Sequence, residues 1–274
     1  MSSDPSTDTQ AVIDLAQTSV TPEQLELGGY YVVNTAQGLT QIDLTAERYL
    51  ESPKRKRGTT TLRDAASFLA YWDKHRTDAS EIYADRNRLQ VVGVIDAHGA
   101  DYDDTGWGEH RVVLELRYSP SFKAWQNLSG NLATQTAFAE FIEDHRTDIR
   151  EPSAAEVLEL AQTFQATNKV SFRSSNRLKS GERQLSYVED VEASAGQRGE
   201  LTIPDELSLG VAVFEGASVA DAVTARLRYR IEDGRLRLGV VLDRVTEVVD
   251  GAFAGVVQEV DNGVSVPILF GTPA

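Results

Sequence analysis

The sequence predicts an α+β protein in which antiparallel β-hairpins and sheets pack against several amphipathic helices. The segment HRVVLELRYS at 110–119 alternates apolar and polar residues, which is typical of a strand with one buried face. Apolar residues over 244–261 recur at the i, i+3, i+4 and i+7 spacing of a helix buried on one side. The second half of the chain is mostly strands that pair with their neighbours around short turns.

The composition restricts the possible partners and chemistry. The chain has 274 residues and a formal net charge of −15, from 42 acidic and 27 basic side chains, so a polyanion can bind only at a local basic patch. The absence of cysteine excludes disulfides, thiolate metal sites and thiol nucleophiles. The longest apolar runs are far shorter than the roughly 20 residues of a membrane helix. We therefore expect no membrane partner. The polar start MSSDPSTDTQ has no basic or apolar region typical of a secretion signal, so we expect no such signal either.

Residues 1–58 are expected to form an N-terminal arm. Its first ten residues have almost nothing to bury, and YYVVNTAQGLTQIDL at 30–44 predicts a short hairpin with Gly38 in the turn. A basic linker follows between Pro53 and Gly58 and interrupts all periodicity. It consists of Lys54, Arg55, Lys56 and Arg57.

Residues 59–274 are expected to form the α+β body, either as one unit or as two lobes, 59–165 and 166–274. Its first helix carries an apolar stripe from Leu62 to Trp72, and we expect Thr61 to cap it. A hairpin, EIYADRNRLQVVGVID, and the alternating strand at 110–119 follow. Further helices are indicated from Pro120, over 134–145, and after a Ser153–Glu156 capping box.

The second half begins with two strands, KVSFRSSNRL and RQLSYVEDVEA, that we expect to pair around Ser180-Gly181. A second hairpin, ARLRYRIEDGRLRLGVVL at 225–242, precedes the helix at 244–261. Asp233-Gly234 suits a two-residue type I′ turn, which places Arg230 opposite Arg237. The hairpin then has an apolar face, expected to be core, made of Leu227, Tyr229, Ile231, Leu236 and Leu238.

The other face of this hairpin carries arginines at every second position. Two of them, Arg230 and Arg237, are directly opposed like charges. Such a pair is unfavourable by up to ~1 kcal/mol unless an acidic group lies across it. Three interpretations are open: pairing with acids of the same subunit, docking onto an acidic region of another copy such as EFIEDHRTDIREPSAAEVLEL, or binding phosphate or nucleic acid. We favour an acidic partner. The residues of this face are Arg226, Arg228, Arg230, Arg235 and Arg237.

Two other stretches have candidate chemistry. The basic tract Lys54–Arg57 can bind phosphates, act as a targeting signal or remain a hydrated linker. In VIDAHGADYDDTGWGEHR, the side chains of Asp96, His98 and His110 form a weak candidate site for a divalent metal; the alternative is a polar loop with hydrogen-bonded histidines. The chain has no serine-hydrolase elbow, phosphate-binding loop or dinucleotide fingerprint. We therefore expect no cofactor and no small-molecule ligand.

Several stretches together resemble the YfdQ-like family of phage and prophage proteins, a domain of unknown function. They include SPKRKRGTTTLRDAASFLAYW, GWGEHRVVLELRYSPSFKAW, VSFRSSNRLKSGERQLSYVEDV and ARLRYRIEDGRLRLGV, and the likeness runs in order from about residue 50 to 262. The resemblance implies a phage or prophage origin and a place in the cytoplasm of a bacterial host. It brings no catalytic residues.

These observations favour a non-enzymatic phage accessory protein that self-assembles into a ring-like or shell-like homo-oligomer through charge-complementary interfaces. The first alternative is a nucleic-acid-associated factor in phage replication or recombination, which would use the hairpin arginines and the basic tract. The second is a metal-dependent hydrolase at Asp96, His98 and His110.

Overall fold

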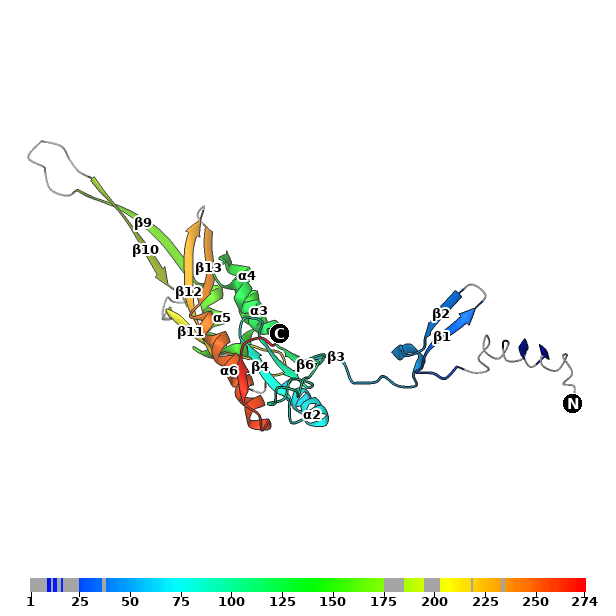
Figure 1. Ribbon diagram of the computed structural model, residues 1–274. Coiled ribbons are helices and arrows are strands. Elements are labelled where there is room, and N and C mark those ends of the chain that lie inside the picture. The colour runs from blue at the N-terminus through cyan, green and yellow to red at the C-terminus, as the bar shows by residue number, and fades with distance from the viewer. Residues whose placement is uncertain are drawn as a thin grey trace, which may run out of the picture. The chain divides into compact units, whose positions relative to one another are not determined.

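A computed structural model of the chain describes residues 9–10, 12–13, 16, 25–35, 38–174, 185–194, 203–217, 219–232 and 235–274. The chain divides into two compact units, Met1–Arg57 and Gly58–Ala274. The helices and the antiparallel and mixed sheets confirm the predicted α+β class (Figure 1).

The first unit contains the predicted hairpin. Strands β1 (Tyr30–Thr35) and β2 (Gly38–Asp43) are antiparallel, and Thr35 pairs with Gly38. A short 3-10 helix, η1 (Glu47–Tyr49), follows. Apart from Thr9 and Gln10, the first ten residues lie outside the described part of the chain.

The first sheet of the second unit has the order β14-β4-β5-β6-β3. Its edge strands β14 (Ile268–Phe270) and β3 (Gly58–Leu62) run parallel to their neighbours, whereas β4 (Glu81–Asp85), β5 (Gln90–Val94) and β6 (His110–Glu115) are antiparallel. Burial alternates along β6 as predicted. Helix α2 (Ala65–His75) contacts β6 and contributes two fully buried aromatic side chains to the core, Phe68 and Trp72.

The expected cap of α2 is wrong by three residues. Thr61 lies in β3, where its backbone pairs with Val113, so the chain is still extended at that position. The helix is capped by Asp64, whose carboxylate accepts a hydrogen bond of 2.7 Å from the backbone N–H of Ser67.

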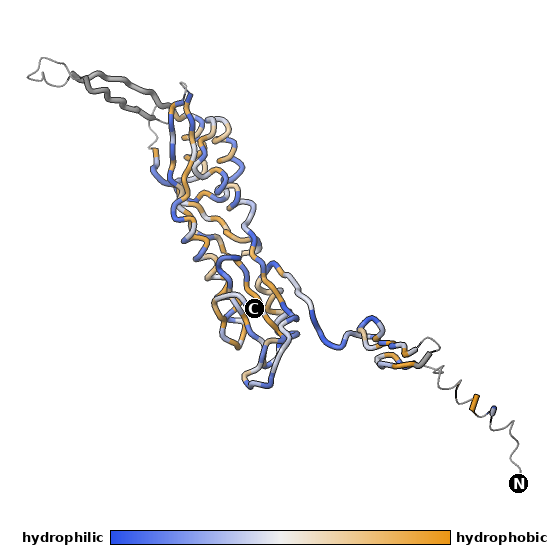
Figure 2. Tube along the Cα trace, turned by 45° about the horizontal axis from the view of Figure 1, so that its top comes forward, coloured by the Kyte–Doolittle hydropathy of each residue, from blue (hydrophilic) through white to orange (hydrophobic). Residues whose placement is uncertain are grey.

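The second sheet has the order β7-β13-β12-β11-β8 and is antiparallel throughout. Its helices contact β12 and β13, and their apolar residues join those of the first sheet in one continuous core. Figure 2 shows the hydropathy of each residue along the chain. The strands are β7 (Ala133–Thr134), β8 (Ile149–Glu151), β11 (Glu206–Val211), β12 (Asp221–Glu232) and β13 (Arg235–Leu242). The helices are α3 (Pro120–Leu128), α4 (Gln135–Asp144), α5 (Ala154–Thr163) and α6 (Val245–Gly263), with a 3-10 turn, η2 (Arg146–Asp148), before β8.

Several local predictions for this unit are confirmed. Ser153 and Glu156 form the capping box of α5. Helix α6 covers the predicted periodic segment, and its buried residues Val249, Phe253, Val257 and Val260 keep the helical spacing. The two strands expected after α5 pair as β9 (Gln165–Ser174) and β10 (Leu185–Ser194). The turn expected at Ser180-Gly181 lies outside the described residues.

The cap of α2 gives a first test. We expect Asp64→Ala to lower the free energy of unfolding by about 1 kcal/mol, because the N–H of Ser67 loses its acceptor. Thr61→Ala is the matched control and should lower the free energy of unfolding much less, since Thr61 is an exposed edge-strand residue. Urea unfolding followed by circular dichroism measures both. Equal losses would contradict the assignment of the cap.

Candidate functional site

The β12–β13 hairpin has the register expected from the sequence. Arg230 lies opposite Arg237, and Glu232 lies opposite Arg235. The turn residues themselves, Asp233 and Gly234, lie outside the described part of the chain.

The two faces of the hairpin differ as a half-buried sheet requires. Leu227 and Leu238 are buried beneath the helices, but the apolar face is not core along its whole length. Tyr229 remains 38% exposed, and its ring centre lies 4.9 Å from that of Phe164. Ile231 and Leu236 are half-buried, so the expectation that all five apolar residues are core holds only at the base of the hairpin.

The opposite, outward face carries all five predicted arginines, because residues at every second position and their cross-strand partners share one side. We call it the open face of the second sheet. Its arginines are Arg226, Arg228, Arg230, Arg235 and Arg237, of which the first and last are half-buried and the other three exposed.

The arginines differ in their local partners. Arg226 forms an ion pair of 2.8 Å with Asp243, and Arg230 lies 3.3 Å from Glu232 on its own strand. Arg228 donates to the backbone carbonyl of Leu227. Among the residues whose side chains the structure describes, which exclude those of β9 and β10, no carboxylate lies in ion-pair distance of Arg228, Arg235 or Arg237. Asp243 therefore compensates Arg226 at the base of the hairpin, whereas the described residues nearer its tip carry four arginines against one glutamate, Glu232.

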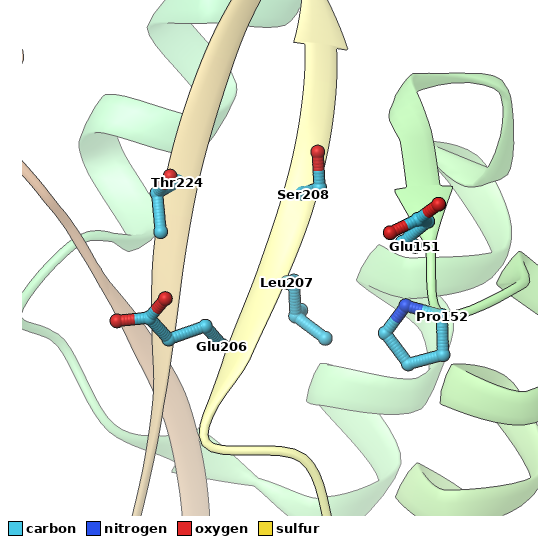
Figure 3. Close-up of a pocket in the computed structure, with 6 residues that line it drawn as sticks. All are labelled: Glu151, Pro152, Glu206, Leu207, Ser208 and Thr224. Atoms are coloured by element: carbon cyan, nitrogen blue, oxygen red, sulfur yellow. The ribbon is translucent and has the colours of Figure 1, made fainter.

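The other end of the open face carries charges of both signs, since Glu151 and Glu206 lie there and the guanidinium of Arg150 lies close over Gly210. Ser208 of β11 pairs with Thr224 of β12 on one side and with Glu151 of β8 on the other, and the register shifts at Ser208/Leu209. A cavity of about 530 Å³ lies here. Figure 3 shows its lining residues, Glu151, Pro152, Glu206, Leu207, Ser208 and Thr224.

Sequence reasoning included Glu151 in the acidic region at 140–160 but missed that Glu206 lies near it. Neither Glu151 nor Glu206 has a basic side chain in ion-pair distance among the residues that the structure describes. A local signal existed for one of them, since ELSLGV at 206–211 alternates polar and apolar residues. No local pattern shows that β8, a three-residue strand, lies beside it.

The acidic helical region proposed as a docking surface is partly engaged in the fold. Asp148 accepts a hydrogen bond of 2.9 Å from the indole N–H of Trp125 and another from the hydroxyl of Ser121. Hydrogen bonds from the side chain and backbone of Ser153 hold the pKa of Glu156 below its ordinary value. Glu140 and Glu143 of α4 remain exposed, without a basic partner in the described part of the chain.

The basic tract belongs to the first unit. Arg57 forms an ion pair of 2.7 Å with Glu47. Lys54 and Lys56 are exposed, and Arg55 is half-buried.

The weak metal candidates have structural partners. The carboxylate of Asp96 accepts hydrogen bonds from the backbone N–H groups of Glu109 and His110, at 3.2 and 2.7 Å. His98 accepts from the N–H of Gly106, and the His110 ring lies 2.9 Å from the hydroxyl of Tyr71. Among the described residues, no group of three or more histidines and carboxylates has a metal-binding arrangement.

The fold and this site together define an α+β protein with a half-buried antiparallel sheet and a charged outer face. The chain belongs to the family described as "Uncharacterized conserved protein (DUF2303)", whose sequence model matches residues 7–273. Comparisons with curated proteins and with solved structures gave no match. None of the helices in the described ranges combines the length and the apolar character that a membrane span needs.

The opposed arginines give a second test. We expect Arg237→Glu to raise the free energy of unfolding by up to ~1 kcal/mol, because it converts a like-charge pair with Arg230 into an opposite-charge pair. Arg235→Glu is the matched control and should have the opposite sign, since it creates a like-charge pair with Glu232. Both should be measured at a protein concentration low enough to exclude self-association. The same sign for the two variants would contradict the cross-strand explanation.

Proposed function

We propose that this chain is a non-enzymatic accessory protein of a phage or prophage. In this proposal it assembles in the bacterial cytoplasm into a ring-like or shell-like homo-oligomer, held by contacts between its arginine hairpin and an acidic surface of another copy. The supporting observation is the outer part of the β12–β13 hairpin, where Arg228, Arg235 and Arg237 have no carboxylate partner among the side chains that the structure describes.

A second copy is a favourable partner for electrostatic reasons. The chain has an excess of 15 negative charges, so each copy presents many carboxylates to a neighbour. A single exposed ion pair contributes only about 0–1 kcal/mol, but several arginines on one rigid ribbon can form a network of charge-assisted hydrogen bonds. Contacts between two unlike patches produce closed rings or shells when the rotation between copies closes.

The phage assignment rests on the resemblance to YfdQ-like proteins over about residues 50–262. Membership of the DUF2303 family is compatible with it. Neither assigns a reaction, and the side chains of Asp96 and His98 accept hydrogen bonds from backbone N–H groups of their own loop.

The assembly is tested by reversing charge at the ribbon tip. We expect the wild-type chain to form an oligomer, and Arg228→Glu/Arg230→Glu to shift it toward smaller species because acidic residues then face acidic residues. Size-exclusion chromatography with light scattering measures the mass. Lys74→Glu/Lys123→Glu, at two exposed helical positions, makes the same change in charge and should leave the mass unchanged. A wild-type monomer at micromolar concentration in low and moderate salt would contradict the proposal.

A nucleic-acid role is the second candidate. It is favoured by the exposed two-stranded ribbon with arginines on both strands, since such a ribbon fits the major groove of DNA. If this role is the true one, labelled DNA or RNA should bind at 50 mM salt and weaken steeply as salt rises, because phosphate contacts release counterions. The Arg228→Glu/Arg230→Glu variant should then lose binding. No shift at low salt, or a flat salt response, would exclude it.

A further inference from the structure

Strand β14 forms an open edge of the first sheet in the part of the chain that the structure describes. It pairs in parallel with β4, and just after it the backbone N–H of Gly271 donates to the carbonyl of Ala84. Backbone groups alternate between the two sides of a strand, so Leu269 shares the inward side with Gly271. The N–H and C=O groups of Ile268 and Phe270 therefore point outward, away from β4.

The side chains at this edge are apolar and exposed. Phe270 is 78% exposed and Leu269 is 43% exposed. Residues 264–274 contain no charged side chain, although natural edge strands are commonly protected from pairing by a lysine or another charge. Pro267 and Pro273 lie on either side of the strand, so a pairing partner can engage only a short stretch of it.

An apolar cavity of about 510 Å³ lies on the face of β14 that points toward α6. Phe270 lines it from the strand, and the buried side chains of Phe253 and Val257 line it from the helix. Two of the three charged side chains in its lining, Arg86 and Asp250, form an ion pair with each other. This cavity therefore suits an apolar side chain.

The cavity on the opposite face of β14 is acidic. Leu269 lies on this side, because side chains alternate along a strand, and it lines a second cavity of about 510 Å³. Arg76 donates to Ser265 in the segment just before β14, but it is also paired with Asp73 at 3.4 Å. Among the described residues, no lysine or arginine lines the cavity, whereas four carboxylates do, those of Asp78, Glu81, Asp101 and Asp104. This cavity therefore suits a basic side chain.

We propose that β14 is the binding edge for an extended segment of a partner protein in which apolar and basic residues alternate. The backbone of the segment pairs with the outward groups of Ile268 and Phe270. Its apolar side chains enter the cavity beside α6, and its lysine or arginine side chains enter the acidic cavity. In strand addition of this kind, main-chain hydrogen bonds give affinity and pockets for alternate side chains give specificity.

Other occupants fit the edge less well. A second copy could pair its own β14 with this one, but residues 264–274 supply no cation for the four carboxylates. A nucleic acid would bring phosphates toward the same carboxylates. A metal ion could meet the carboxylates, but it would leave the outward backbone groups and the apolar cavity unoccupied.

A short labelled peptide of alternating valine and lysine tests the proposal on the full chain. We expect saturable binding, measured by fluorescence anisotropy, and no binding of the matched peptide of alternating valine and glutamate. No saturable change up to about 1 mM protein would overturn the proposal. Equal binding of the two peptides would overturn it as well.

Two substitutions at one position test strand addition. Phe270→Pro removes the outward N–H and hinders the approach of a second strand, whereas Phe270→Ala removes only the ring. Neither breaks a hydrogen bond to β4, because the N–H of Phe270 points away from it. We expect Phe270→Pro to bind the peptide about tenfold more weakly than Phe270→Ala. Equal affinities would contradict pairing at this edge.

The acidic cavity is tested by removing charge. Asp78→Asn/Asp101→Asn should weaken peptide binding about fivefold, since each exposed ion pair contributes little. Glu143→Gln/Asp144→Asn removes the same charge from exposed positions of α4 and should leave the affinity unchanged. Equal weakening by both variants would mean that net charge alone attracts the peptide, and would overturn the site. Circular dichroism of each variant verifies the fold.

Hydrogen exchange identifies the occupant. The peptide should slow exchange of the Ile268 and Phe270 amides at a fixed protein concentration. If exchange instead slows when the wild-type chain alone is concentrated, a second copy pairs with the edge, and a separate partner is overturned. The Arg228→Glu/Arg230→Glu variant should bind the peptide like the wild type, which separates this inference from the assembly proposed above.

Discussion

The structure depends on one constraint, the two-residue period of a half-buried antiparallel sheet. In the second sheet, Leu207, Val223 and Leu238 alternate with residues that cannot enter the core. Burial of one face against the helices fixes the register, because a slip by one residue would bring the arginines into the core. The same constraint that forms the core therefore forces five arginines onto a single outward face.

Local pairing then determines which of those charges remain available. Asp243 follows directly after β13, so its carboxylate is held beside Arg226 at the base of the hairpin. The tip extends beyond the part of the sheet that β11 covers, since β11 pairs with β12 only as far as Arg226. Beyond that point the described pairing of β12 is with β13 alone. The distribution of charge on the open face therefore depends on the lengths of its strands as well as on their composition.

The sequence was sufficient for features that depend on local signals. The Asp-Gly turn and the alternation on either side predicted the register of the hairpin, and the Ser153–Glu156 spacing predicted the start of α5. Contacts between distant segments were not predictable. The parallel pairing of β14 with β4, and the position of β8 beside β11, join parts of the chain with no shared pattern. The cap of α2 was misplaced because Thr61 suits a cap and an edge strand equally well.

The candidate site, like the fold, could be predicted from the sequence only where local patterns determine it. Periodicity placed the arginines on one face, whereas Glu151 and Glu206, 55 residues apart in sequence, come together at its other end only because β8 pairs with β11. The loop with Asp96 and His98 looked like a metal site because the residue types were suitable, but their hydrogen bonds go to backbone groups nearby.

The central claim, that a second copy covers the open face, is tested most directly by the reactivity of a single thiol on it. The chain has no cysteine, so Ser208→Cys introduces one exposed sulfur on the open face, and Ala155→Cys introduces a matched one on the exposed side of α5. We expect the rate at which a thiol reagent labels position 208 to fall as the protein concentration rises, because a second copy then covers that position. The rate at position 155 should not change. Equal labelling rates at all concentrations in an assembled sample would contradict it.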